Sequence, residues 1–412
     1  MNRTRRALAL VTLSAAALAA CDTASVYEDC TLESKVGSGE GRCPPSTFPV
    51  ELDWGRQVSG TVSAGDERVA NALLRVGDHL VSADESGAYR VPFAPLRYDV
   101  IARLPEDVVT YRGVGYRYID LAIERDVPLR AWTSRLAVKV EGGPRPGHEL
   151  VFFGGPEVVG LAGDAASGLV VSTRTFDTEI TVHVVEIPEG GELTRATAHG
   201  STKARTEGGG TAAAAIALTA LEPPRSTTFA VEPPAGLVLG DVEVTLDFGT
   251  RRSERLATRV PLDVPLALPS LPGARWSAHL EARRADAAAS SGRVFVEPGK
   301  DVELTLFDPP TLVAPAEAAV AEGRTLSASG GGVFEHVLVP LDGQGHTIRV
   351  VTAEAEARVP DLTEVTLPRA TGRYAWTVRS FPDFAFVDAL SGLDVRLYRA
   401  RSSAGPRTVF LP

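Results

Sequence analysis

The chain has 412 residues, of which 44% are hydrophobic and 23% charged, with 42 basic residues against 52 acidic ones and a formal net charge of −10. These proportions are those of a globular protein, and the length is ample for several hydrophobic cores and too long for one ordinary sandwich. The acidic balance argues against a nucleic-acid partner and against a polybasic contact with a membrane.

Residues 1–20 have the pattern of a secretion signal. Arg3, Arg5 and Arg6 precede an apolar run without charge from Ala7 to Ala20. As a helix this run would be about 21 Å long, which is too short to cross a bilayer core of about 30 Å. We therefore predict a cleaved signal peptide and not a resident membrane span.

The end of this signal, Leu18-Ala19-Ala20-Cys21, resembles a bacterial lipobox. The resemblance implies that Cys21 carries acyl chains such as palmitate and becomes the first mature residue. Each buried methylene contributes about 0.8 kcal/mol, so two or three chains hold a protein firmly on a membrane. The alternative is an ordinary signal cleaved nearby, with Cys21 left as a free thiol. We expect a lipoprotein anchored in the bacterial cell envelope, on its periplasmic or surface side.

Residues 21–53 are predicted to be a lipidated tether, because they show little periodicity and contain Gly37-Ser38-Gly39 and Pro44-Pro45. Cys30 and Cys43 are the right number for one disulfide in an oxidising envelope. A metal site is a poor alternative, since there is no C-x-x-C and the first histidine is His79.

Alternating strands begin after this tether, at 58–62, 70–77, 79–83, 88–93 and 97–102. Ser59-Gly60-Thr61-Val62, residues 69–72, the turn at 84–89 and residues 98–100 resemble the carboxypeptidase regulatory-like domain, a transthyretin-like β-sandwich. The resemblance implies a non-catalytic module, here residues 54–127, that accompanies other domains. No metallocarboxypeptidase domain accompanies it in this chain, so peptidase activity is not implied.

The segment 110–123 contains Tyr111, Tyr116 and Tyr118 and completes this module. These tyrosines are candidate ligand-binding residues, because together on one exposed surface they would stack against a sugar. The alternative is that they pack at a strand edge.

Three further sandwich modules are predicted at 128–222, 223–308 and 309–412, with boundaries near Pro223-Pro224 and Pro309-Pro310. Spacings of about 90 residues suit one sandwich each. The alanine-rich stretch 211–221 suits either a helix or a closing strand, and its context favours the strand. In the last module Tyr374, Trp376 and Val378 alternate with smaller or polar residues. This strand and its proline-rich entry resemble a fibronectin type III-like domain.

The predicted fold class is therefore all-β, with tandem β-sandwich modules behind a cleaved lipoprotein signal peptide. One tryptophan falls in each module. Trp276 and Trp376 are expected in cores, whereas Trp54 and Trp132 stand at module entrances, where packing and exposure are both open.

No residue set has the pattern of an active site. Seven histidines are scattered over the chain without H-E-x-x-H, and G-x-S-x-G is absent. Glu106-Asp107 is expected to be solvated loop charge, and Gly330-Gly331-Gly332 a flexible loop. Calcium between modules is left open for loop acids such as Asp84 and Asp342, although no twelve-residue ligand pattern supports it. No catalytic residue, cofactor or metal is predicted.

The predicted function is that of a non-catalytic envelope protein that acts as a binding, adhesion or scaffold module. Its partners would be the membrane, through the lipid, and an envelope protein or polysaccharide, but no nucleic acid. A carbohydrate-binding protein is the first alternative. An enzyme with a site between modules is the second.

Overall fold

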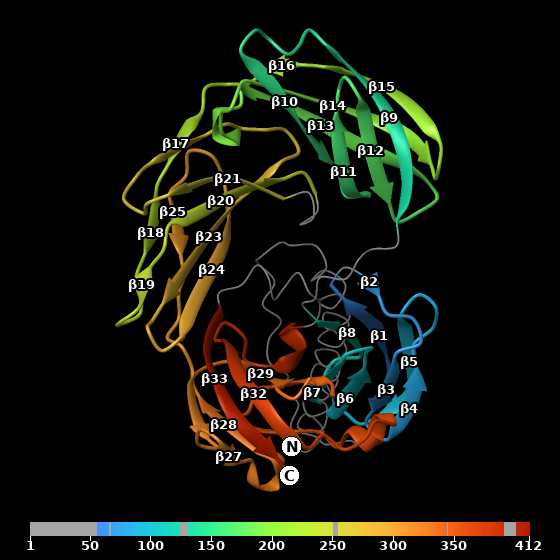
Figure 1. Cartoon of the computed structure of the whole chain (residues 1–412), viewed down its shortest axis with the longest axis vertical. Coiled ribbons are helices and arrows are strands. Elements are labelled where there is room, and N and C mark those ends of the chain that lie inside the picture. Colours follow the sequence, from blue (N-terminus) through green and yellow to red (C-terminus); the bar gives the residue numbers. More distant parts are fainter. Residues whose placement is uncertain (1–55, 66, 124–130, 250–253, 344, 391–400) are drawn as a thin grey trace, which may run out of the picture.

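The computed structural model describes residues 56–65, 67–123, 131–249, 254–343, 345–390 and 401–412. Helical segments in this part of the chain are short 3-10 turns, and the remaining regular structure is β-strand. The predicted all-β fold class is confirmed. We call β1–β8 the first module, β9–β16 the second, β17–β25 the third and β26–β33 the fourth (Figure 1).

The first two modules are built from short and medium-length strands. The first contains β1 (Arg56–Ala64), β2 (Glu67–Arg68), β3 (Leu73–Val76), β4 (His79–Ser82), β5 (Ala88–Ala94), β6 (Tyr98–Arg103), β7 (Asp107–Val114) and β8 (Tyr118–Ile123). The second contains β9 (Trp132–Glu141), β10 (His148–Gly154), β11 (Val158–Asp164), β12 (Gly168–Thr173), β13 (Asp177–Pro188), η1 (Leu193–Arg195), β14 (Ala198–Glu207), β15 (Thr211–Ala217) and β16 (Thr219–Ala220).

The third module contains β17 (Arg225–Thr227), β18 (Phe229–Val231), β19 (Val238–Leu239), β20 (Val242–Asp247), β21 (Arg255–Val260), β22 (Leu266–Leu268), β23 (Arg275–Arg283), β24 (Ala289–Val296) and β25 (Val302–Leu304). The fourth contains β26 (Thr311–Ala314), β27 (Ala319–Val320), η3 (Glu322–Arg324), β28 (Thr325–Ser329), β29 (Val333–Pro340), β30 (Thr347–Thr352), β31 (Glu356–Arg358), η4 (Leu362–Val365), β32 (Gly372–Phe381), η5 (Val387–Leu390) and β33 (Arg401–Leu411).

The second module is a sandwich of two four-stranded sheets, in the orders β11-β12-β9-β15 and β10-β13-β14-β16. Leu136, Ile180 and Ile216 lie in the core between them. The alanine-rich stretch forms strand β15, which pairs in parallel with β9. The strand prediction is confirmed for Thr211–Ala217, because pairing with a neighbour outweighs the helical propensity of alanine.

A single fourteen-stranded sheet links the other three modules. Its main order is β21-β20-β23-β24-β33-β32-β29-β30-β7-β6-β3-β4, with β19 and β27 paired at its side. The third module joins the fourth where β24 pairs antiparallel with β33, from Ala289 opposite Ser403 to Ser291 opposite Arg401. The fourth joins the first where β30 runs parallel to β7, from Thr347 beside Asp107 to Val351 beside Tyr111.

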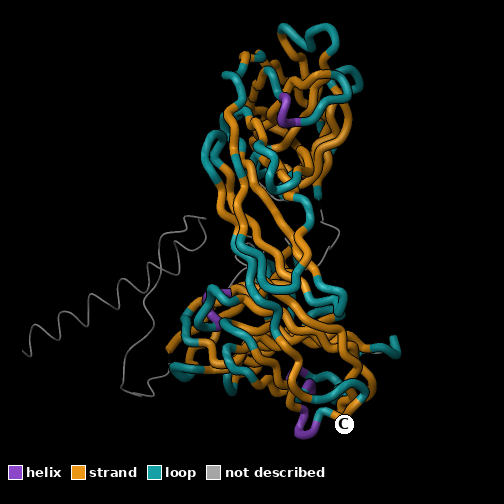
Figure 2. Tube along the Cα trace, turned by 90° about the vertical axis from the view of Figure 1, so that its left-hand side faces the viewer, coloured by secondary structure: helices purple, strands orange, loops and turns teal. Residues whose placement is uncertain are grey.

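The pairing of β7 with β30 brings the first and last modules of the chain together. The first and fourth modules lie at one end of the molecule, and the second and third at the other (Figure 1). A view turned by 90° again divides the molecule into an upper and a lower part along its long axis (Figure 2). The modules are therefore not strung out in a line, although their order along the chain is tandem.

The sheet shared by the first and fourth modules separates two hydrophobic cores. On one face, Val333, Val351 and Phe381 of the fourth module join the core of the first. On the other face, Ile101 and Val108 of the first module join the core of the fourth. Each of these cores is completed by the other module, so we expect the two modules to stabilise each other.

The second and third modules also share a core. Phe153, Val185 and Ile187, on the outer face of the β10-β13-β14-β16 sheet, pack with Val244 and Trp276 of the third module. Trp276 is 2% exposed and Trp376 is fully buried, as predicted for core tryptophans. Trp54 lies outside the described residues, and Trp132 is 51% exposed.

One loop prediction is confirmed as a loop and another is wrong. Gly330-Gly331-Gly332 is a tight turn between β28 and β29, in which Gly330 and Gly332 have positive φ, and its flexibility stays a prediction. Asp107 is not solvated loop charge, because it begins strand β7 and is only 5% exposed. Its neighbour Glu106 is exposed. The buried position of Asp107 follows from the pairing of β7 with a strand more than two hundred residues away.

Candidate functional site

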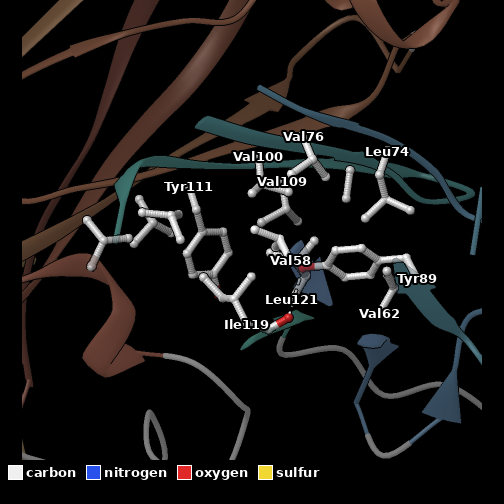
Figure 3. Close-up of a cluster of buried hydrophobic side chains, with 14 of the residues drawn as sticks. Val58, Val62, Leu74, Val76, Tyr89, Val100, Val109, Tyr111, Ile119 and Leu121 are labelled. Carbon is white, nitrogen blue, oxygen red and sulfur yellow. Dashed lines mark hydrogen bonds between the residues drawn. The ribbon is translucent and has the colours of Figure 1, made fainter. Parts of the chain in front are cut away.

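Tyr111, the first of the predicted stacking tyrosines, lies in a core. Its side chain is fully buried, and it packs among Val100, Val109 and Ile119 of the first module (Figure 3). Side chains alternate across a strand, and its place on β7 puts Tyr111 on the inner face. The prediction that Tyr111 contributes to an exposed sugar-binding surface is therefore wrong.

Tyr116 and Tyr118 are half-buried. The Tyr116 ring contacts Phe386 of the fourth module, with ring centroids 5.9 Å apart. The Tyr116 carbonyl accepts a hydrogen bond from the Tyr98 hydroxyl at 2.6 Å. Tyr118 begins β8 beside Ser59. The structure therefore does not gather the three tyrosines on one surface, and a ligand-binding role for Tyr116 or Tyr118 stays a prediction.

Cys21, Cys30 and Cys43 lie outside the described residues. Lipidation of Cys21 and a disulfide between Cys30 and Cys43 stay predictions.

A buried charged network crosses the junction of the first and fourth modules. Arg349 on β30 contacts Asp107 on β7 at 3.3 Å and Glu335 on β29 at 3.6 Å. Arg379 on β32 contacts the other oxygen of Glu335 at 3.4 Å. Asp107 and Glu335 are at most 5% exposed, so their charges have lost most of their hydration. The ion pairs with the arginines must compensate for that loss. The network ties four neighbouring strands of the shared sheet together.

A second contact at this junction is made by Asp388 in η5. Its carboxylate accepts hydrogen bonds from the backbone N–H groups of Gly115 and Tyr116, the shortest at 2.9 Å from each. Burial raises the pKa of Asp388, and the two backbone bonds oppose that change. Asp388 thus caps the turn between β7 and β8 from the opposite end of the chain.

A pair of buried histidines occupies the joint between the second and third modules. Nδ1 of His183 lies 3.3 Å from Nε2 of His199. His183 is 8% exposed and His199 is 6% exposed. Phe248, which follows β20 of the third module, stacks on both rings. Burial lowers the pKa of His183 to about 4 and also lowers the pKa of His199. The sequence had no signal for this pair, because sixteen residues separate the two histidines.

An exposed aromatic pair lies at the end of the second module. Trp132 and Phe176 are 51% and 44% exposed, and their rings meet edge to face with centroids 5.0 Å apart. Gly208 lies beneath them, where an added Cβ would come within 2.8 Å of Phe176 and 2.9 Å of Trp132. The Gly208 N–H donates to the Phe176 carbonyl at 2.6 Å. The two rings are therefore held in place, although exposed.

No group of three or more His, Cys, Asp or Glu side chains in the described part of the chain is arranged to hold a metal ion. The Asp84 carboxylate instead accepts bonds from the Ser86 N–H, the Ser86 hydroxyl and the Ala88 N–H within its own turn. Among the described helices, none has the length and apolarity needed to cross a membrane.

No protein-family model and no curated protein sequence matches the chain. A solved structure of the Bacillus anthracis TIE protein is 10% identical over 61% of this chain and 50% of its own length, with a TM-score of 0.15. The chain thus spans half the length of that protein. Immunoglobulin domains 1–4 of Sidekick-1 are 8% identical over 87% and 95%, with a TM-score of 0.13.

A third similar structure is Bacteroides ovatus SGBP-B, from a mixed-linkage glucan utilization locus, in complex with a mixed-linkage heptasaccharide. It is 8% identical over 73% of this chain and 83% of its own, with a TM-score of 0.14. At these TM-scores none of the three similarities carries an argument about this chain.

Proposed function

We propose that this chain is a lipid-anchored protein of the bacterial cell envelope that acts as a binding or scaffold protein and not as a catalyst. The observation that carries the proposal is the parallel pairing of β7 with β30, which joins the first module to the last. Together with the shared cores, this pairing holds the modules in a fixed arrangement. Fixed spacing of exposed loops and strand edges is what a scaffold has to provide.

The identities of the modules belong to the same proposal. We assign the first module to the carboxypeptidase regulatory-like domains and the fourth to fibronectin type III-like domains. The first assignment is supported by Gly60, within the Ser59–Val62 stretch, whose α-carbon lies so close to β8 that an added Cβ would be 1.9 Å from the Ile119 carbonyl oxygen. Only glycine allows this close parallel approach.

The anchor is tested by expressing the full chain with its own signal in a bacterial host and labelling with a palmitate analogue. We expect label and membrane association in the unaltered chain, and loss of both in Cys21→Ser. Cys30→Ser is the matched control and should keep both. A labelled Cys21→Ser protein, or an unaltered chain that is secreted without label, would contradict the anchor while leaving the scaffold proposal to its own test.

The scaffold role is tested with the chain from residue 22 onward, which lacks the lipid. We expect saturable binding to an envelope protein in a screen against envelope proteins, glycans and peptidoglycan fragments. Turnover of a screened compound without stable binding would contradict the proposal and favour an enzyme.

The exposed Trp132–Phe176 pair favours carbohydrate binding as a second candidate function. Exposed aromatic rings offer an apolar face on which a sugar can stack. Because both rings pack against Gly208, their side chains lose less conformational entropy when a ligand binds. If a glycan binds there, Trp132→Ala should weaken its affinity at least about tenfold, a loss of about 1.4 kcal/mol. Phe93→Ala removes another exposed aromatic ring and is the control. Equal affinities for both variants would exclude this site.

A further inference from the structure

The two buried histidines lie diagonally on neighbouring strands. His183 on β13 is opposite Ser201 of β14, and His199 on β14 is opposite Val185 of β13. Both side chains lie on the sheet face that packs on the third module. The centroids of the two imidazole rings are 5.5 Å apart, the facing nitrogens are 3.3 Å apart, and the ring planes differ by 19°. The centroid separation is therefore about the nitrogen–nitrogen distance plus the radii of the two rings. The two imidazoles therefore meet edge to edge, nitrogen to nitrogen.

The third module closes over this couple. The Phe248 ring lies 4.2 Å from the His183 ring at an angle of 23°, and 5.5 Å from the His199 ring at 8°. On the Gly273 side, an added Cβ would be 3.5 Å from Cε1 of His183. Solvent therefore reaches the couple poorly, and a positive charge on it would lose hydration.

The acids around the couple are occupied by cations of their own. In the third module, the Asp247 carboxylate is paired with Arg275. A cation of the same module at this joint, Arg255, lies over the Phe153 ring of β10. Along β13 and β14, Glu186 is bound by Arg145, and Glu179 by Lys203. In the described part of the chain no carboxylate is hydrogen-bonded to either imidazole. Among the described residues, a proton added to the couple thus has no carboxylate hydrogen-bonded to it.

We propose that the His183–His199 couple is an acid-operated latch, in which two bound protons release Phe248 and the adjoining corner of the third module from the second. In the neutral couple one facing nitrogen donates its hydrogen and the other accepts. A first proton goes to an outer nitrogen and leaves this bond intact. A second proton must go to the accepting nitrogen, so two N–H groups then face each other and the bond is lost.

Burial and mutual repulsion act in the same direction. Burial lowers the pKa of His183 to about 4, and the neighbouring His199 adds to that effect. Opening restores both groups to water, where a histidine has a pKa near 6.5. The closed joint is therefore favoured at neutral pH and weakened as the pH falls below about 6.5. Because two protons bind on opening, the opening constant rises by up to about 100-fold per pH unit at the steepest point.

The test uses the whole chain from residue 22 with isotope-labelled histidine. Nuclear magnetic resonance follows the ring signals of both histidines from pH 7.5 to 3.5. Hydrogen exchange, corrected for its intrinsic pH dependence, follows the segment 242–249. We expect His183 and His199 to titrate below pH 6 and the protection of 242–249 to fall over the same range. Segment 168–173, which is strand β12 in the other sheet of the second module and contains no histidine, should keep its protection.

His199→Gln separates the proton count from simple loss of packing, because an amide can hydrogen-bond to His183 but takes up no proton. We expect its opening constant to rise no more than about tenfold per pH unit. His79→Gln, at an exposed position of β4, is the matched control and should keep the steeper dependence. A His199→Gln curve as steep as that of the control would overturn the latch.

Phe248→Leu is the second variant, needed if His199→Gln does not fold. It keeps both histidines but uncovers their rings, so both should titrate at higher pH and the joint should open at higher pH. Histidines that titrate while segment 242–249 stays protected, or a segment that opens before they titrate, would each overturn the proposal.

Discussion

Asp107 and Arg349 are bound to each other across the boundary between the first and fourth modules, with Oδ1 of the acid 3.3 Å from Nε of the arginine. The two residues lie on strands that pair in parallel and are separated by 242 positions in the chain. Arg349 also contacts Glu335, which binds Arg379 in turn. The junction therefore combines strand pairing and buried charge.

Glu335→Gln should destabilise this junction strongly. Glu335 is 1% exposed and neutralises two arginines, so its loss leaves buried positive charge with too few partners. We expect the free energy of unfolding of the first and fourth modules to fall by about 3 kcal/mol. Urea denaturation at pH 7 measures it. Glu179→Gln breaks the exposed pair with Lys203 and should change the free energy of unfolding much less, because water screens that pair. Equal losses would show that the network contributes little.

Asp388→Asn should change how stability depends on pH. Burial raises the folded-state pKa of Asp388 above its ordinary value of 3.8, so folding favours the protonated acid. Its stabilising contribution is therefore present below pH 3.8 and is lost as the pH rises through the folded pKa. Asparagine does not ionise, so it makes no pH-dependent contribution to the free energy of unfolding. Measured from pH 3.5 to 7, the stability of the unaltered chain should fall relative to that of the variant, and parallel curves would contradict this.

Gly332→Ala and Gly331→Ala should have opposite outcomes although the residues are adjacent. Gly332 has a φ of +78°, and an added Cβ would lie 2.1 Å from the Phe381 carbonyl oxygen. We expect Gly332→Ala to destabilise the fourth module by about 3 kcal/mol. Around Gly331 no atom lies within 4 Å of an added Cβ, so Gly331→Ala should be neutral or stabilise by up to about 1 kcal/mol. Thermal unfolding compares the two, and similar midpoints would contradict the tight-turn geometry.

His336→Phe should remove a contribution to the stability of the fourth module that is lost in acid. His336 is fully buried, and its Nδ1 accepts a hydrogen bond from the Trp376 indole N–H at 3.3 Å. Burial lowers the pKa of His336 to about 4, so its neutral form is favoured by folding. The stabilisation is present above pH 6.5 and is lost as the pH falls towards 4, with a total of about 3 kcal/mol.

The His336→Phe variant should be less stable at pH 7, because the indole N–H loses its acceptor, but its stability should change less between pH 7 and 4. Denaturant titrations at both pH values measure this difference. His346→Gln, at a half-buried position outside the core, is the control. A variant with the pH dependence of the unaltered chain would place the acid-sensitive term elsewhere.

Local pattern was sufficient for much of the fold. The period-2 alternation of Val242, Val244 and Leu246 predicts their common face, and all three are fully buried. The same alternation predicts the buried Trp376 on β32. These predictions succeed because the side chains of a strand alternate by geometry, whatever the strand pairs with. The pattern does not distinguish the two faces of a strand such as β7, which is buried on both sides, and the prediction for Tyr111 is wrong for that reason.

What the sequence by itself determined is the all-β fold class and, for strands such as β20 and β32, the buried face. The membrane anchor stays a prediction. Only the tertiary structure decided that β7 pairs with β30, that Asp107 meets Arg349 and that His183 meets His199 under Phe248. The physical reason is that strands pair through backbone N–H and C=O groups, which are the same in every residue except proline. A strand edge therefore carries little local information about its neighbour, and that choice is made by the packing of the whole chain.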